Sequence, residues 1–519
     1  DLGYLPNSDS GSTAQRLGLS KVGDWGYVGV SISDTENLYG IPFHGDSHDA
    51  HGDEDDDDHA DEDDHDDDHA DEDGHEGEGE HEGERIFSKT ESNVINVEGS
   101  YIVPNSWLTK IDYHFRDSDY AHTEQHAEEE GHEGEEHDDE QHEEGPTTFT
   151  NDAQEYGAIF NLGNDSLSQK LAVNYVVEDI AVIGDEAFIN PTESKELTLG
   201  YYLSKDLDLF HVDFGIRHDQ ISRNGSVSHD EHEEDHDEHE EDHDEHEAEL
   251  EYFDRDIDTT SYALTLSRDI NESLEVSLGF SSVERAPSAV ELLMNGPHLA
   301  TARFEVGNFN LKSERANNVD LSFKYSNDGF YGGLTFFQND VNNYIYLMDE
   351  TEDDHADHED EDDHDGLTLA KYLQQDAEFK GYELEVGKTF DLARGALSLS
   401  FARDSVSGEF TDGHNIPRMT PERNLYKINY VEDGLTFTLI LKDVSAQNDT
   451  AENETATSGF QMLNLNLSKT IETSPGSELV LSVFGKNLLD EAARNHSSFV
   501  KDEVPMSGRN LGVRVSYSF

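Results

Sequence analysis

Hydrophobic and polar residues alternate with a period of two along most of the chain, which is the pattern of β-strands that have one apolar face. Residues 511–519 show it most clearly. Their odd positions hold Leu, Val, Val, Tyr and Phe, and the even positions between them hold Gly, Arg, Ser and Ser. The apolar face suits lipid, and the polar face suits a water-filled interior. A half-buried strand of a water-soluble sheet alternates in the same way, so this segment alone leaves both structures open.

The lengths of the connections favour the membrane protein. The alternating segments predict about 19 strands, and short turns alternate strictly with long loops between them. Outer-membrane barrels have this organisation, with short periplasmic turns, long outer loops and antiparallel strands. We therefore predict an all-β fold, an antiparallel transmembrane β-barrel. The predicted strands are residues 13–22, 26–34, 86–100, 106–118, 147–163, 166–178, 195–204, 207–222, 257–268, 274–284, 315–326, 330–347, 372–388, 396–406, 424–431, 435–442, 459–471, 478–487 and 508–519.

Four acidic runs account for most of the formal net charge of −86. They lie at about 44–84, 117–144, 229–256 and 349–365, each in a long loop, which predicts that all four face the outside. Runs of this composition repel themselves and bury too little apolar area to fold alone. Their charge argues against nucleic acid as a partner, because neutralising phosphates requires Lys and Arg, and it favours cations.

Several classes of protein are excluded by what the sequence lacks. The chain has no cysteine, which excludes disulfides and thiolate metal sites. It contains no run of about 18 apolar residues that would form a transmembrane helix. It shows no nucleophile with a matching base, no phosphate-binding loop and no dinucleotide fingerprint. We therefore expect neither an enzyme nor an organic cofactor.

Histidine is concentrated in the acidic runs, which hold 22 of the 28 histidines. Carboxylates alone suit calcium and magnesium, and imidazole shifts the preference toward zinc, copper and nickel. In the third run the histidines recur at steps of four and three, which would place them on one face of a helix that metal binding stabilises. The alternative is that the third run is a solvated, disordered loop and that its regular histidine spacing arose by repeat slippage. The candidate ligands are His232, His236, His239, His243 and His246 in the third run, and His59, His65 and His69 in the first.

A group of motifs resembles the TonB-dependent receptors of the bacterial outer membrane. The longest match lies within residues 284–314 and includes Asn-Gly-Pro-His-Leu-Ala-Thr at 295–301 and Phe-Glu-Val-Gly-Asn at 304–308. Residues 485–490 and 508–510 resemble the last two strands of that family and the loop between them. The other segments that fit the same group are residues 39–42 and 184–188.

The resemblance implies a function. Residues 295–301 with their histidine, together with the His- and Asp-rich outer loops, look most like the zinc-importing receptors of the family. This implies that His298 is a metal ligand inside the barrel mouth, with Glu305 as a candidate carboxylate nearby. The implied role is outer-membrane transport of a divalent metal, zinc above others, in a Gram-negative bacterium. The implied partners are the TonB energy-transducing complex, outer-membrane lipid and the metal ion, with the receptor acting as a monomer.

The resemblance also implies a longer protein. The family's barrel has 22 strands and encloses a plug domain, and both chain ends lie on the periplasmic side. The first predicted strand leads into a short turn, so it runs inward. If it is the fourth strand, 19 strands end at the twenty-second. We therefore expect residues 1–519 to be a partial receptor barrel, without the plug and the first three strands.

Two other functions stay open. A receptor for a metal chelate, such as a siderophore or haem, would use the acidic runs only to concentrate ions or to shield the surface. A surface protein that binds calcium would use the acidic runs as its main site. Uptake of a ferric chelate but not of free zinc would favour the first alternative, and tight calcium binding without a preference for zinc would favour the second.

Overall fold

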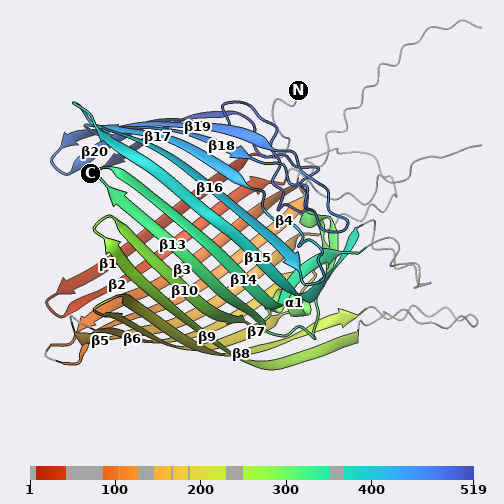
Figure 1. Ribbon diagram of the computed structural model, residues 1–519. Helices are drawn as coiled ribbons and strands as arrows, with labels where there is room; N and C mark the ends of the chain where they lie inside the picture. The colour runs from red at the N-terminus through yellow and green to blue at the C-terminus, as the bar shows by residue number, and fades with distance from the viewer. Residues whose placement is uncertain are drawn as a thin grey trace, which may run out of the picture.

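The computed structural model describes residues 8–41, 86–104, 106–126, 145–164, 167–184, 187–229, 249–350 and 367–519. Long strands form the curved wall of a barrel (Figure 1). The first strands are β1 (Ser10–Gly23), β2 (Gly26–Gly40), β3 (Ile86–Ile102), β4 (Leu108–His126), β5 (Thr147–Asn164), β6 (Leu167–Ile183), β7 (Thr192–Asp206), β8 (His211–His229), β9 (Glu249–Asn271) and β10 (Leu274–Arg285). The connection after β10 contains α1 (Ala289–Leu293), β11 (Asn295–His298), the 3₁₀ turn η1 (Leu299–Thr301) and β12 (Arg303–Val306). The later strands are β13 (Glu314–Asn327), β14 (Phe330–Asp349), β15 (Thr368–Asp391), β16 (Ala396–Phe410), β17 (Arg423–Glu432), β18 (Leu435–Val444), β19 (Phe460–Ser474), β20 (Ser477–Lys486) and β21 (Asn510–Ser518).

The wall is an antiparallel meander in which each strand pairs with the next wall strand along the chain. Strand β10 pairs with β13, because β11 and β12 leave the wall as a separate hairpin. In the described ranges, the other 19 of the 21 strands form the wall, which agrees with the number predicted from the sequence. Among the described residues, β1 pairs only with β2 and β21 only with β20, so the sheet is open between its two end strands.

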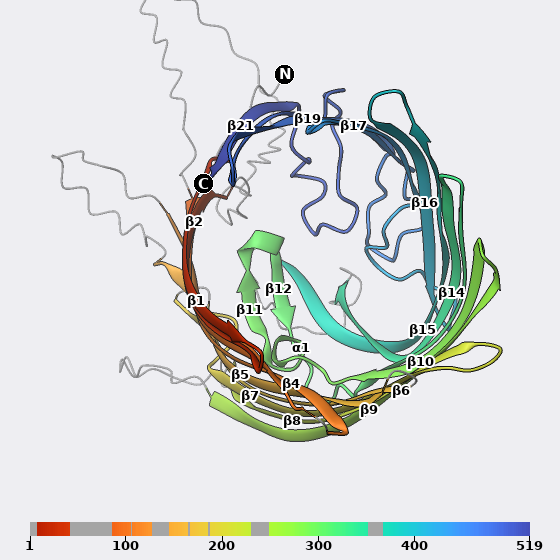
Figure 2. The same ribbon diagram turned by 90° about the vertical axis from the view of Figure 1, so that its left-hand side faces the viewer.

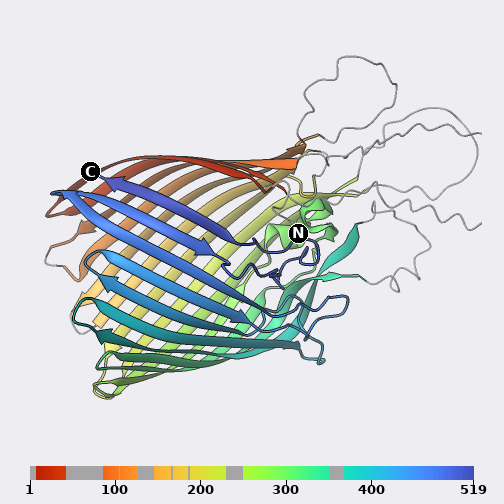
Figure 3. The ribbon, with the colours of Figure 1, turned by 90° about the horizontal axis from the view of Figure 1, so that it is seen from above.

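The short turns and the long connections lie at opposite ends of the barrel (Figure 3). A tight turn such as that between Asn327 and Phe330 joins two strands at one end, and a long loop such as 487–509 joins two strands at the other. The turn at Asn327 needs the backbone of Gly329, which has a φ of 77°. The predicted alternation of connection lengths is confirmed.

The two faces of the wall strands differ in what they contact. Phe149 on β5 packs inward against the core, so the period of two turns Tyr156 on the same strand outward. The Tyr156 ring is exposed and lies 4.9 Å from the ring of Phe115 on β4. Phe401 and Tyr426 form a similar pair on β16 and β17, with ring centres 5.1 Å apart. Outward aromatic rings on neighbouring strands are typical of the aromatic girdle of an outer-membrane barrel.

The hydrophobic core lies where the connection between β10 and β13 folds into the barrel (Figure 2). Helix α1 begins with a capping box, in which Ser288 and Glu291 each accept a hydrogen bond from the backbone N–H of the other. Leu292 and Leu293 are buried and pack against the inner faces of β6 and β8. Each such leucine stabilises the packed connection by roughly 1.5–3 kcal/mol. Among the described residues no helix has the length and apolar character needed to cross a membrane.

Strands β4 and β9 extend further into the acidic runs than predicted. The prediction ended the fourth strand at residue 118 and began the ninth at residue 257, whereas β4 continues to His126 and β9 begins at Glu249. These extensions also alternate with a period of two, but their acidic composition concealed this pattern in the sequence. On the inner side of these extensions, His122 contacts Phe149 and Phe253 packs against the core. The wall therefore extends into the acidic runs, and its outward positions there include the exposed Leu250 and Tyr252 on β9.

Candidate metal-binding site at the barrel mouth

The hairpin β11–β12 carries both predicted site residues that the structure describes, His298 and Glu305. Its strands pair antiparallel over four positions, and β12 also runs parallel to the start of β15. The backbone N–H of Asn295 donates to the carbonyl of Phe188 at 2.8 Å, which ties the hairpin to the loop after β6. Gly296 has a φ of 153°, and a Cβ there would lie 3.0 Å from Cβ of Phe188. Only glycine lets the hairpin approach this closely without a shift.

His298 and Glu305 contact each other directly. Nδ1 of His298 lies 2.8 Å from Oε1 of Glu305, and the hydroxyl of Thr301 lies 3.0 Å from the same oxygen. Glu305 is 3% exposed, whereas the side chain of His298 is 28% exposed. Among the described residues, Nε2 of His298 has no hydrogen-bond partner. Because a carboxylate accepts at Nδ1, the favoured neutral tautomer carries its proton there and leaves a lone pair on Nε2.

His298 lies at the end of a series of contacting rings along the inner wall. Its ring centre is 5.1 Å from that of Phe188. The Phe188 ring is 5.5 Å from Phe149, which in turn is 5.5 Å from His122 near the outer end of β4. The contact with Phe188 restrains the plane of the His298 ring, so the direction in which Nε2 points is restricted.

His122 is a useful contrast, because it also lies beside a carboxylate. Its Nδ1 is 2.9 Å from Oγ1 of Thr90, and its Nε2 is 3.0 Å from Oε1 of Glu124. Both ring nitrogens are therefore engaged, and His122 is a structural histidine with satisfied hydrogen bonds. Of these two histidines, only His298 keeps a nitrogen available for a ligand.

The predicted ligands in the acidic runs lie outside the residues that the structure describes, so their role stays a prediction. Within the described ranges, no three His, Asp or Glu side chains come together as a metal centre. The described part of the site is therefore one open imidazole with a buried carboxylate behind it. The predicted ligands outside the described ranges are His59, His65, His69, His232, His236, His239, His243 and His246.

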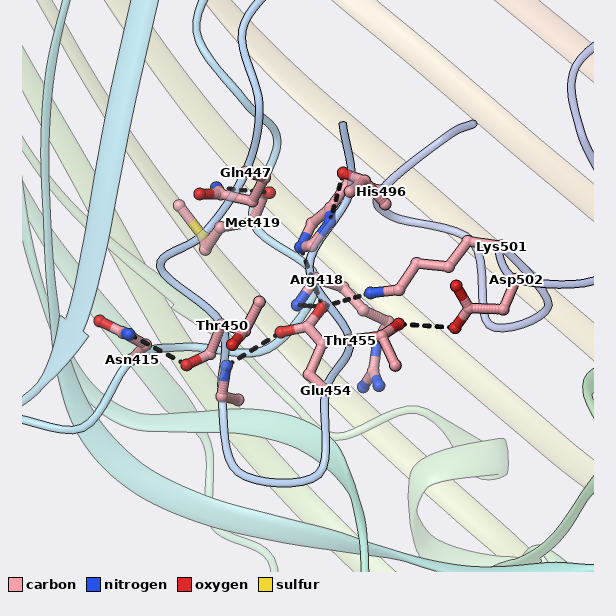
Figure 4. Close-up of polar contacts among 12 residues, drawn as sticks. Asn415, Arg418, Met419, Gln447, Thr450, Glu454, Thr455, His496, Lys501 and Asp502 are labelled. Atoms are coloured by element: carbon pink, nitrogen blue, oxygen red, sulfur yellow. Dashed lines mark hydrogen bonds and ion pairs between the residues drawn. The ribbon is translucent and has the colours of Figure 1, made fainter. Parts of the chain in front are cut away.

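Sequence reasoning missed a polar cluster that joins the outer loops 411–422, 445–459 and 487–509, hereafter the outer loop cluster (Figure 4). Glu454 lies at its centre. Its Oε1 accepts a hydrogen bond from the backbone N–H of Arg418 at 2.9 Å and lies 3.2 Å from Nζ of Lys501. Lys501 is only 5% exposed. The three loops are thus held together through one carboxylate.

His496 is the buried histidine of this cluster, at 1% exposure. Its Nδ1 is 3.0 Å from Oγ1 of Thr457, and its Nε2 is 3.1 Å from Oε1 of Glu454, without the alignment of a hydrogen bond. Burial lowers the pKa of His496 below its usual value of 6.5. The positive charge of Lys501 lowers it further, while Glu454 and Asp502 oppose this effect. The sequence placed His496 on an outer loop, but it did not predict its burial or its contacts with Thr457 and Glu454.

A pocket of about 80 Å³ connects the outer loop cluster to the β11–β12 hairpin. The ring of Phe499 lies in its wall and contacts two guanidinium groups, with its centre 4.6 Å from Cζ of Arg303 and 4.2 Å from Cζ of Arg418. Arg303 also pairs with Asp349 at the end of β14, with Nη2 and Oδ2 2.7 Å apart. A space of this size is far smaller than the roughly 300–1,000 Å³ of ordinary ligand pockets.

Comparison with known families identifies the barrel. Residues 13–488 match the model of the TonB dependent receptor-like β-barrel. The chain belongs to this family. TonB-dependent receptor barrels lie in the outer membrane of Gram-negative bacteria, and this barrel is an outer-membrane protein of the same kind. The predicted family is therefore confirmed.

Solved structures of TonB-dependent receptors have the same fold. The copper transporter OprC has a TM-score of 0.70 at 13% identity, with 99% of this chain and 73% of that chain covered. The FrpB iron transporter from Neisseria meningitidis has a TM-score of 0.62 at 11% identity, with 98% and 72% covered. The ferric yersiniabactin uptake receptor FyuA from Yersinia pestis has a TM-score of 0.60 at 13% identity, with 98% and 70% covered. At these identities the likeness is one of fold.

Two curated relatives match a short part of the TonB-dependent receptor barrel. The ferric enterobactin receptor of Pseudomonas aeruginosa is 32% identical over 99 residues, and the probable hemoglobin and hemoglobin-haptoglobin-binding protein 1 of Haemophilus influenzae is 35% identical over 91 residues. Each match covers 17% of this chain, and the matches cover 13% and 8% of the relatives' own lengths. The names of these relatives refer to copper, iron, siderophores and hemoglobin and not to zinc, so the zinc-importing subtype stays a prediction.

Proposed function

We propose that this barrel is part of an outer-membrane receptor that imports a divalent transition metal, with zinc as its cargo. The observation that supports this best is the contact between His298 and Glu305. Metal-binding histidines usually donate their second ring N–H to a carboxylate, which fixes the tautomer and makes the free nitrogen a better ligand. Zinc accepts such imidazole nitrogens together with carboxylate oxygens.

The remaining ligands come from outside the described residues. A single imidazole holds a metal ion weakly, and a structural zinc site normally has four ligands. The histidines of the acidic runs are one source, and a plug domain inside the barrel is another. In this proposal the acidic runs collect cations near the mouth, because a large negative charge raises the local concentration of positive ions.

Transport and not catalysis is the proposed activity. Residues 1–519 would form a partial barrel domain of a longer receptor, which acts as a monomer in outer-membrane lipid. The energy would come from the TonB complex, which pulls on the plug domain in receptors of this family. The metal is the cargo, and the proposal includes no organic cofactor.

Uptake by cells tests the cargo. Zinc-starved cells that express the receptor are compared with cells that lack it, and each is given radioactive zinc, copper or a ferric siderophore. The proposal predicts that the receptor increases zinc accumulation and that unlabelled zinc competes better than the ferric chelate. Uptake of the ferric chelate without uptake of zinc would contradict it.

A receptor for a metal chelate is the second candidate. The names of the ferric enterobactin receptor and of the ferric yersiniabactin receptor FyuA favour it, since both bind siderophores. The small volume of the pocket beside Phe499 gives it no support. A surface protein that binds calcium is the candidate of another class, and calorimetric titration with calcium and with zinc separates it from both receptors.

A further inference from the structure

We propose that Glu305 is a positioning residue that acts through His298 and does not itself bind the metal. This inference rests on the proposed function, in which His298 is a ligand. It changes the role that the sequence resemblance gave to Glu305, a candidate carboxylate ligand. It also assigns the binding atom, which is Nε2 of His298.

The burial of Glu305 argues against direct coordination. The Glu305 side chain is 4% exposed, whereas the His298 side chain that it contacts is 28% exposed. Its backbone pairs with Gly296 on one side and with Ala370 on the other, and Ala370 is completely buried. The imidazole is therefore much more accessible to a cation than the carboxylate is.

The hydrogen bonds of Glu305 argue for a role in orientation. Oε1 lies 2.8 Å from Nδ1 of His298 and 3.0 Å from the hydroxyl of Thr301, so two donors from the same hairpin converge on one oxygen. A buried carboxylate is stable only when such donors compensate for its lost hydration. The same contacts fix the proton of His298 on Nδ1, and the negative charge favours the positive charge that the ring acquires when Nε2 binds a metal.

The His122–Glu124 pair supplies a matched comparison within the same chain. There too an imidazole nitrogen lies about as close to a carboxylate oxygen, at 3.0 Å. The second nitrogen of His122 is engaged by Thr90, so that carboxylate has no open imidazole to orient. Removing the negative charge at Glu124 should therefore have no effect on metal binding at His298.

Histidine modification can be measured separately in each peptide, so it tests the inference at His298 alone. Metal binding by the acidic runs, which the proposed function includes, does not affect this readout. The chain in detergent is treated with diethyl pyrocarbonate, which modifies free imidazole nitrogens, at zinc concentrations held constant by a chelator. Mass spectrometry of the peptide that contains His298 gives the zinc concentration at which half of the modification is prevented. Migration of the unheated protein on a gel confirms that each variant forms the barrel.

The inference predicts that Glu305→Gln raises the zinc concentration for half-protection about 10- to 100-fold, the usual effect of losing such a partner. Glu124→Gln should leave that concentration unchanged. Equal half-protection in the wild type and in Glu305→Gln would overturn the inference and leave the proposed function standing. Complete loss of zinc protection in Glu305→Gln would show a ligand and would also overturn it. Absence of zinc protection at His298 in the wild type would contradict the proposed site itself.

Discussion

The guanidinium carbon of Arg418 lies 4.2 Å from the centre of the Phe499 ring, although the two residues belong to different outer loops. Arg303, from the β11–β12 hairpin, faces the same ring at 4.6 Å. The Phe499 ring therefore links the outer loop cluster to the hairpin that carries His298. Each partly desolvated cation–π contact contributes about 0.5–2 kcal/mol.

We predict that Phe499→Ala loosens the outer loops without unfolding the barrel. The loss of both contacts should destabilise the closed arrangement by about 1–2 kcal/mol, which is a factor of roughly 5–30 in the population of opened loops. Trypsin cleavage after Arg418 and Arg494 on intact cells should accelerate accordingly. The control is Phe330→Ala, which removes the cation–π contact with Lys388 beside the turn that joins β13 and β14. Equal cleavage in Phe499→Ala and the wild type would contradict the prediction.

Glu454→Gln should separate the loops of the outer loop cluster more strongly. Glu454 is the ion-pair partner of Lys501, and both side chains are less than 10% exposed. Removing the negative charge leaves a buried ammonium group unpaired, which costs about 3–5 kcal/mol. Hydrogen exchange in residues 445–459 and 487–509 should become faster, while exchange in β18 and β19 stays slow.

The matched control for Glu454→Gln is Glu275→Gln. Glu275 pairs with Lys324 at 3.5 Å, and the side chains are 38% and 71% exposed. Such a surface pair contributes about 0–1 kcal/mol, so its loss should leave hydrogen exchange almost unchanged. If both variants behave alike, Glu454 does not hold the loops together.

Acidification should weaken the outer loop cluster through His496. The pKa of His496 in the folded protein is lowered by burial and by Lys501, whereas in opened loops it returns to about 6.5. Opened loops therefore take up a proton more readily, and the stability of the cluster falls as the pH drops below about 6.5. Glu454, Lys501 and Asp502 are the charged groups that act on the imidazole.

Protease sensitivity of the outer loops between pH 7.5 and pH 5 measures this effect. It should increase toward pH 5 in the wild type and increase less in His496→Gln, which keeps a hydrogen-bonding side chain but does not titrate. The same pH dependence in both proteins would assign it to another group.

The sequence predicted the strands of the barrel wall, but it did not predict the β11–β12 hairpin or the contacts between the outer loops. The reasons for this difference are physical. Period-two alternation identifies strands that face lipid, and it located the 19 wall strands of the described residues. It could not find β11 or β12, because four residues are too few to show a period and their pairing depends on Phe188 and β15. The contact between His298 and Glu305 depends on that hairpin. The cluster around Glu454 joins loops that are distant in sequence, and no local pattern predicts it.

The assignment of outward and inward positions on the wall strands predicts where a charged substitution destabilises the barrel. Leu481 on β20 is exposed on the same face as Val483, whereas Ser482 between them lies on the inner face. Leu481→Lys would place an ammonium group in lipid and should destabilise the barrel by about 2–4 kcal/mol near the bilayer centre. Ser482→Lys, one residue away, should have little effect. Urea unfolding in lipid vesicles measures both variants, and equal destabilisation would contradict the assignment of the faces.

The most direct test of the account is zinc uptake by the His298→Ala receptor. Zinc-starved cells that express equal amounts of the wild type, His298→Ala or His122→Ala are given radioactive zinc, and the initial rate is measured over a range of concentrations. We predict that His298→Ala reduces uptake at low zinc at least tenfold, while His122→Ala keeps the wild-type rate, because within the described residues Nε2 has a partner in His122 and none in His298. Uptake by His298→Ala at the wild-type rate would contradict it.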